Sequence, residues 1–350
     1  MSDQVYVLGA GFSKAIDHHM PTTLELGETI TESLRQTQHL QQDFSLERYD
    51  KDFELWLSYL ANDQPWLTTE EQLKNKILLG KATTAVGDEV RQRELNATYW
   101  AEDEAFVHGG LSPNADTRGE FTRLGAHWAG RPGALTACTV ITFNYDTFAE
   151  RLIMMGGYDK DWHHLYVPPL VLPGGAFWPG RSFRQDDSFD SLHAAVLKLH
   201  GSLNWKSAGP DRPDQNIHLT GSAAPDWRSS EGYRDGLEFA WSYLQTLIVP
   251  PTAMKSAYYA IPALAHQWTA AREAIRTATK VIMLGYSLPP TDQAVHAFFA
   301  ETLPGREVVF VNRRKDDGLR LVDIVGAKNV NFKYTGTPNP IPDYIRAEVP

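Results

Sequence analysis

The sequence predicts an α/β protein in which a parallel sheet carries an inserted helical module. Five short apolar runs rich in β-branched residues are typical of buried parallel strands. Helical patterns stand between these runs, and they dominate residues 22–131, between the first run and the second. We therefore expect a sheet domain formed by residues 1–21 and 132–350, with residues 22–131 as the helical insertion.

The predicted strands end at residues that offer polar groups or tight turns. The strands are Gln4–Leu8, Thr139–Phe143, Ala195–Leu199, Lys280–Leu284 and Glu307–Val311. The residues that follow them are Gly9, Asn144, His200, Gly285 and Asn312. Because ligands of open α/β sheets gather at the carboxyl ends of the strands, we expect a site where these five residues meet.

Helices are indicated by capping residues and by apolar side chains at helical spacing. Thr22 and Glu25 have the spacing of a capping box, and either Thr291 or Asp292 is expected to cap a later helix. Residues Lys206–Gly236 are rich in Gly, Pro, Ser and Asp, which predicts a long loop. The apolar stripes predict core packing at Leu26, Ile30 and Leu34, at Phe53, Trp56, Leu57 and Leu60, at Leu264, Trp268 and Ile275, and at Val295, Phe298 and Phe299.

Composition limits the classes of partner and cofactor. The formal net charge of −10 argues against simple affinity for nucleic acid or for an anionic membrane. The one cysteine, Cys138, excludes an internal disulfide framework and any zinc ribbon with four cysteine ligands. The N-terminus lacks a signal-peptide pattern, and no run of about 18 apolar residues occurs. We expect a cytoplasmic protein that binds neither nucleic acid nor membrane directly.

The stretch VLGAGFSKA, residues 7–15, directly follows the first predicted strand. Gly9 and Gly11 allow a tight turn and close approach of a ligand, and Ser13 places a hydroxyl near a helix N-terminus. The loop suits a pyrophosphate, although it lacks the third glycine of the usual dinucleotide fingerprint. The alternative is a strand-to-helix turn that requires small residues for packing alone.

Two further motifs place chemistry-bearing side chains at strand ends. In FNYD, Asn144 suits the holding of a sugar hydroxyl or a water, and Asp146 is either a base or orienting group or the N-cap of the following helix. In LKLHGS, His200 is a packed core histidine, a metal ligand or a catalytic base. Metal binding is the least favoured of the three, because the pairs His18-His19 and His163-His164 have no Cys or acidic partners at ligand spacing.

The stretches GYSL and VNRR complete the set of motifs at strand ends. They supply Gly285, Ser287 and Asn312, which suit the ribose and adenine of a nucleotide. Ordinary turn chemistry is the alternative for each of these residues.

Together, and in this order, GAGFS, FNYD, LHGS, GYSL and VN resemble the motifs of the sirtuin family and its bacterial sirtuin-like relatives. The resemblance implies a Rossmann-like parallel sheet domain that binds NAD and cleaves its nicotinamide–ribose bond. It implies that Asn144 and Asp146 hold the nicotinamide ribose and a water, with His200 as the base. The implied nucleotide-binding residues are Gly9, Ala10, Gly11, Phe12, Ser13, Gly201, Gly285, Ser287 and Asn312.

The departures from the family pattern narrow the expected activity. Protein-deacetylating sirtuins carry a zinc ribbon built on two cysteine pairs after the His-Gly motif, whereas Lys206–Gly236 contains no cysteine. Of the family's Ile-Pro-Asp-Phe-Arg segment, this chain keeps only Pro21. The helical insertion with its LWLSYL stretch is similar to bacterial sirtuin-like proteins of antiphage defence, which hydrolyse NAD.

We therefore expect an NAD hydrolase with NAD as substrate and no zinc. The resemblance implies a homo-oligomer, controlled by self-assembly or by a separate partner such as a hexameric ATPase. One alternative is a deacylase or ADP-ribosyltransferase that uses the same bond cleavage. Another is a regulator that binds the nucleotide without breaking it.

Overall fold

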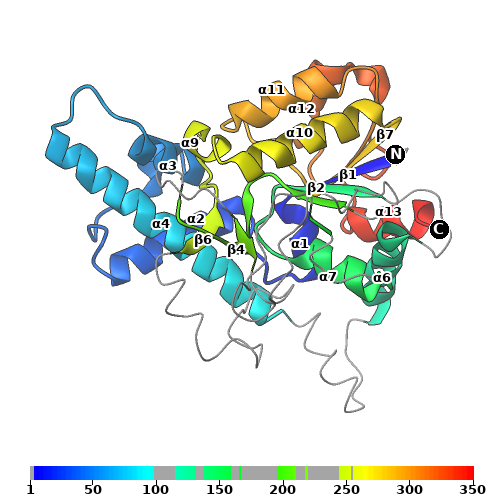
Figure 1. The fold of residues 1–350 in the computed structure, drawn as a ribbon, viewed down its shortest axis with the longest axis horizontal. Helices are drawn as coiled ribbons and strands as arrows, with labels where there is room; N and C mark the ends of the chain where they lie inside the picture. The colour runs from blue at the N-terminus through cyan, green and yellow to red at the C-terminus, as the bar shows by residue number, and fades with distance from the viewer. Residues whose placement is uncertain are drawn as a thin grey trace, which may run out of the picture.

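A parallel sheet of six strands forms the centre of the fold (Figure 1). The computed structural model describes residues 4–97, 115–130, 138–158, 165–166, 195–209, 217–219, 244–253 and 255–350. The strands of this sheet are β1 (Gln4–Leu8), β2 (Thr139–Thr142), β3 (Ala195–Lys198), β7 (Lys280–Leu284), β8 (Glu307–Val311) and β9 (Val330–Asn331).

The strand order defines a Rossmann-like sheet. The order is β3-β2-β1-β7-β8-β9, and every neighbouring pair is parallel. Counted along the chain, this is the 3-2-1-4-5-6 order of doubly wound nucleotide-binding folds. Val5 pairs with Thr139 on one side of β1, and Gln4 pairs with Lys280 on the other. The order therefore reverses between β1 and β7, which is the switch point of the sheet.

Helices cover both faces of the sheet (Figure 1). One face carries α10 (Pro262–Thr277), α11 (Gln293–Thr302) and α12 (Asp316–Val325). The other carries α1 (Ala10–Ile16), α6 (Ala115–Ala129), α7 (Phe148–Met155) and α13 (Pro340–Glu348). Alternate residues of β1 serve the two faces, since Val5 and Val7 pack with the first group and Tyr6 and Leu8 with the second.

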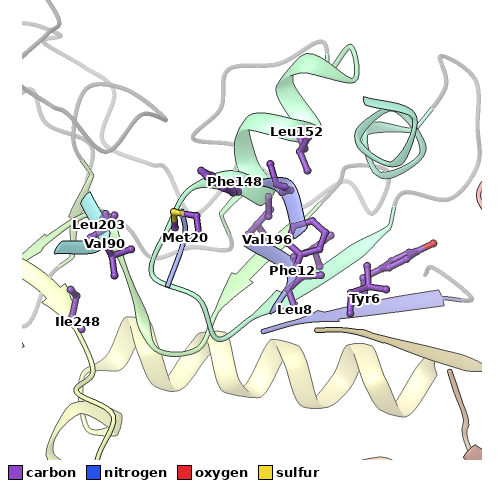
Figure 2. Close-up of a cluster of buried hydrophobic side chains, with 14 of the residues drawn as sticks. Tyr6, Leu8, Phe12, Met20, Val90, Phe148, Leu152, Val196, Leu203 and Ile248 are labelled. Carbon is purple, nitrogen blue, oxygen red and sulfur yellow. The ribbon is translucent and has the colours of Figure 1, made fainter. Parts of the chain in front are cut away.

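Three helices within the predicted insertion share a hydrophobic core with one face of the sheet. They are α2 (Thr23–Gln36), α3 (Phe53–Ala61) and α4 (Thr69–Leu95), preceded in the case of α3 by the short turn η1 (Leu46–Tyr49). Figure 2 shows Val90 of α4 beside Leu203 and Ile248, in the same cluster as Leu8 and Phe12. The predicted capping box forms, because Thr22 and Glu25 bond reciprocally at the start of α2.

The helix α6 lies within the predicted insertion but packs on the helices of the sheet layer. It contacts α7 and α13, and a Cβ built on Gly125 would lie 2.1 Å from Leu152 O. Arg123 Nη2 donates a hydrogen bond to Ile345 O at 2.7 Å. The division of the chain at residues 22 and 131 stays a prediction.

A second, antiparallel sheet follows the His-Gly motif. Its order is β5-β4-β6, with β4 at Gly201–Ser207, β5 at His218–Leu219 and β6 at Gln245–Ile248. The prediction of a loop from Lys206 to Gly236 was therefore wrong at the end of β4 and at β5, where fully buried Trp205 pairs with Leu219. Residues 210–216 and 220–236 of that segment lie outside the described residues.

The remaining sequence predictions agree closely with the observed elements. Two strands end one residue earlier than predicted, at Thr142 and Lys198, and the two-residue strand β9 was missed. Asp292, the predicted cap, precedes α11 and accepts a hydrogen bond from Val295 N. The short elements α9 (Ser256–Tyr259) and η5 (Ala327–Asn329) complete the assignment. None of the described helices combines the length and apolar character that a membrane crossing requires.

Candidate functional site

A cavity of about 680 Å³ opens at the carboxyl end of the parallel sheet. It lies over the switch point between β1 and β7, where ligands of such sheets bind. The residues after all five predicted strands line it, as expected from their position. The predicted site residues that line it are Gly9, Ala10, Gly11, Ser13, Asn144, Asp146, His200, Gly285, Ser287 and Asn312.

The glycines of the first loop allow two loops to approach closely. Gly11 N donates a hydrogen bond to Gly285 O at 3.0 Å. A Cβ on Gly9 would lie 2.6 Å from Tyr286 Cα, and a Cβ on Gly285, which has φ of +63°, would lie 2.3 Å from Phe12 N. Packing alone therefore requires small residues here, whether or not the loop also faces a phosphate.

Ser13, Asn144 and Asp146 form a buried hydrogen-bonded group in the cavity wall. Asn144 Nδ2 donates to Gly9 O and to Ser13 Oγ, both at 2.9 Å. Ser13 Oγ in turn donates to Asp146 Oδ2 at 2.7 Å. Since both amide hydrogens of Asn144 are used, its Oδ1 remains as the acceptor. Asp146 Oδ1 accepts from Phe148 N at 3.1 Å, so this side chain also caps α7.

Several buried ionisable groups surround Asp146. Burial raises the pKa of its carboxyl group, and the nearby ammonium of Lys198 opposes that rise. Lys198 is completely buried, donates to Asp146 O and lies 3.0 Å from Glu150 Oε1. Both carboxyl oxygens of Glu94 accept from Thr147 N, at 3.1 and 3.2 Å. Burial and the charge of Asp146 raise the pKa of Glu94 to about 8.

His200 lies between aromatic rings and an ion pair. Its ring centroid is 5.1 Å from that of Phe143 and 6.3 Å from that of Trp268. Its Nε2 is 3.4 Å from Lys255 Nζ and 3.5 Å from Asp292 Oδ2. Burial, and then the charge of Lys255, lower the pKa of His200 well below its ordinary value. The imidazole is therefore neutral at pH 7 and can accept a proton.

Lys255, Asp292 and Glu54 are ionisable residues of the cavity that were not predicted as site residues. Lys255 and Asp292 form an ion pair at 2.5 Å, and the Glu54 carboxylate of α3 accepts a hydrogen bond from Thr291 Oγ1. Burial raises the pKa of Glu54. Asp292 was identified only as a helix cap, and its second carboxylate oxygen is the one that faces Lys255. Lys255 stands in a segment without helical or strand periodicity, so no sequence signal marked it.

Two predicted nucleotide-binding residues do not line the cavity. The ring of Phe12 packs in the hydrophobic core, 5.9 Å from Phe121 and 5.7 Å from Trp128 between centroids. Gly201 is buried in β4 with φ of +82°, and a Cβ there would lie 2.2 Å from Leu247 O. The ring of Phe12 anchors the loop to the hydrophobic core, and the lack of a side chain at Gly201 allows β4 to approach β6.

Ser287 and Asn312 lie at the rim of the cavity. Ser287 is exposed, and its carbonyl accepts a hydrogen bond from Arg320 Nη2 at 2.7 Å. Asn312 Nδ2 donates to Tyr286 O at 3.3 Å, which joins the loops after β7 and β8.

The pair His18-His19 has an acidic partner after all. Asp17 Oδ1 lies 3.0 Å from His19 Nδ1, and the side chains of Asp17, His18 and His19 bring three ligand-type atoms within 4.8 Å of one another. The prediction that this pair has no acidic partner was therefore wrong. His163-His164 lies outside the described residues.

No protein-family model matches the chain, and no curated protein is significantly similar to it. The fold and the cavity therefore define the class of protein. The chain is an α/β protein with a Rossmann-like parallel sheet, additional helices and a cavity at the switch point.

Proposed function

We propose that the protein is an NAD hydrolase, which cleaves the nicotinamide–ribose bond to give nicotinamide and ADP-ribose. The observation that carries this proposal is the meeting of a neutral histidine, His200, with the Ser13–Asn144–Asp146 group in one cavity at the switch point. The cavity volume lies within the range of small-molecule sites. The five motifs that resemble those of sirtuins supply the identity of the nucleotide.

The reaction needs few protein groups. The bond from ribose C1′ to the nicotinamide nitrogen breaks, its electron pair goes to that nitrogen, and nicotinamide leaves as a neutral molecule. A water oxygen then bonds to C1′, and the water loses a proton. The protein has to hold the ribose, place the water and accept the proton, and no redox partner is required.

The residues of the cavity suit these tasks. Gly9 O and Ser13 Oγ fix the amide of Asn144, which leaves Oδ1 to accept a hydrogen bond from a ribose hydroxyl or from the water. Ser13 holds the carboxylate of Asp146 beside that amide. Neutral His200 is the base, and a positioned base typically contributes about 10²–10⁴-fold to a rate.

The finer biological role rests on the resemblance alone. We propose that NAD depletion serves antiphage defence, and that self-assembly or a partner protein such as a hexameric ATPase controls it. This proposal expects the rate per chain to rise with protein concentration or on addition of the partner. A full and constant rate at every concentration, with the chain alone, would contradict it.

The decisive experiment measures nicotinamide release from NAD by the wild type, Asn144→Ala and His200→Ala. It is run over a range of protein concentrations, with and without an acylated peptide. Lys280→Gln is the matched control, because Lys280 pairs with Glu307 at the opposite end of the strands. We expect release without peptide in the wild type and the control, and a loss of about 10²–10⁴-fold in both site variants.

The other outcomes identify the alternatives. Release only with acylated peptide would indicate a deacylase, and labelling of an acceptor protein would indicate an ADP-ribosyltransferase. Binding of NAD without release, at concentrations where the chain assembles and with its partner present, would indicate a regulator and overturn the proposal.

A further inference from the structure

We infer that Lys255 is a positioning residue for His200: its ammonium makes the shorter contact with the carboxylate of Asp292 and so keeps that carboxylate from pairing closely with the imidazole. The sequence motifs assigned no role to Lys255, and assigned Asp292 only the capping of a helix. The inference rests on the proposed function for its consequence in catalysis. Its structural part can be tested without any reaction.

The distances show which group holds Asp292. Lys255 Nζ is 2.5 Å from Asp292 Oδ2, whereas His200 Nε2 is 3.5 Å from the same oxygen. The lysine and the histidine therefore compete for one acceptor oxygen, and the lysine makes the closer contact. The side chains of Lys255, Asp292 and His200 are 2%, 4% and 8% exposed, so water does not screen the competition.

Hydrogen bonds hold the carboxylate of Asp292 and the backbone of Lys255. Asp292 Oδ1 accepts from Val295 N as the cap of α11. The carbonyl of Lys255 accepts from Tyr258 N at 3.0 Å and from Tyr259 N at 3.2 Å, at the start of α9. Both residues that line the cavity here directly precede a helix, Lys255 before α9 and Asp292 before α11.

The charged groups around His200 come from three separate parts of the chain. Lys255 precedes α9, Asp292 precedes α11, and Glu54 of α3 interacts with both of them. Two aromatic rings of the described residues also lie beside the imidazole, Phe143 after β2 and Trp268 on α10. Removal of the Lys255 charge would leave Asp292 as the nearest charge to Nε2.

An aspartate paired with an imidazole favours the protonated imidazolium, whereas a base has to start neutral. Lys255 therefore keeps His200 able to accept a proton at and below neutral pH. If Lys255 becomes uncharged, His200 pairs with Asp292, and the pH below which His200 is protonated rises. Activity then falls at low pH and recovers at high pH.

The test is a histidine NMR titration of the full-length, ligand-free protein, with the His200 signal assigned from the His200→Gln variant. We compare the wild type with Lys255→Met, Lys255→Arg, Asp292→Asn and the Lys255→Met/Asp292→Asn double variant. Lys280→Met is the control. In Lys255→Met we expect the His200 midpoint to rise by about one pH unit or more. It should stay low in Lys255→Arg and in Asp292→Asn, and fall back in the double variant.

A His200 midpoint in Lys255→Met equal to that of the wild type would overturn the inference. If Lys255→Met does not fold, Lys255→Gln takes its place, and the same comparison applies. If the midpoint stays low in Lys255→Met while the affinity for NAD falls, Lys255 contacts the nucleotide instead, which also overturns the inference.

The same variants connect the titration with catalysis. In Lys255→Met, the pH below which the rate of nicotinamide release falls is expected to rise by the same amount as the NMR midpoint. The rate at high pH stays near that of the wild type. Absence of release in the wild type would contradict the proposed function and leave the NMR result standing. If the His200 midpoint rises in Lys255→Met but the pH dependence of nicotinamide release does not change, His200 is not the base.

Discussion

Ser13 Oγ donates a hydrogen bond to Asp146 Oδ2 at 2.7 Å, although the two residues lie 133 positions apart in the sequence. The bond joins the glycine loop after β1 to the FNYD motif after β2. Ser13 also accepts from Asn144 Nδ2, so that one hydroxyl orders both polar side chains of the second motif. The serine of the first loop therefore has a structural task whether or not it meets a phosphate.

Replacement of this hydroxyl is expected to weaken both the fold and the site. In Ser13→Ala, a buried amide hydrogen of Asn144 and a buried oxygen of Asp146 lose their partner, which costs about 1–3 kcal/mol of unfolding free energy. Urea unfolding measures this loss. Thr84→Ala, which removes an exposed hydroxyl from α4, is the control and should change the free energy by less than about 0.5 kcal/mol. Equal stability of Ser13→Ala and the control would contradict the assignment.

The contact between the loops after β1 and β7 leads to a second prediction. Gly285 and Gly305 both have positive φ, but a Cβ on Gly285 would meet Phe12 N at 2.3 Å, whereas a Cβ on Gly305 would meet open space. Gly305→Ala should therefore cost only the backbone strain, about 1 kcal/mol. Gly285→Ala should cost more, because the glycine loop has to move. The difference in urea midpoint between the variants isolates the steric part, and no difference would show that the loop yields freely.

Much of the sheet and the meeting of its strand ends could be predicted from the sequence. A parallel strand buried on both faces is a continuous apolar run, and in QVYVL, KVIML and EVVFV the run and the strand coincide. Because parallel strands bring their carboxyl ends to one edge, Gly9, Asn144, His200, Gly285 and Asn312 had to lie near one another. The two residues of β9 are too few to form a pattern.

The rest of the site depends on tertiary contacts that no local pattern records. Glu54 reaches the cavity from α3, and Lys255 from a segment without periodicity. Phe12 was assigned to the nucleotide by its place within GAGFS, but α1 turns its ring toward Trp128 in the core. A residue within the loop motif can therefore point away from the cavity, because the helix sets the direction of its side chain.

Removal of metal is expected to leave nicotinamide release unchanged. The proposed chemistry uses Asn144, Asp146 and His200, and the sequence offers only Cys138 where a zinc ribbon would need four cysteines. The test is release before and after extensive treatment with EDTA. The variant His18→Ala/His19→Ala is measured alongside, since His18 lines the cavity beside Asp17. A loss of release in EDTA that Zn²⁺ restores would contradict the prediction.

Glu94 makes the stability of the fold depend on pH in a direction opposite to that of a salt-bridged carboxylate. Its folded-state pKa of about 8 lies above the ordinary value of 4.5, so the folded chain holds a proton there that the unfolded chain releases. The stabilisation is complete below about pH 4.5 and is lost as pH rises to about 8, at no more than about 1.4 kcal/mol per pH unit.

Glu94→Gln keeps an acceptor for Thr147 N but cannot ionise. Its unfolding free energy should therefore decline less steeply than that of the wild type from pH 5 to 8 in urea titrations, whereas the exposed control Glu28→Gln should follow the wild type. Parallel declines in Glu94→Gln and the wild type would mean that Glu94 is ionised in the folded protein throughout this range.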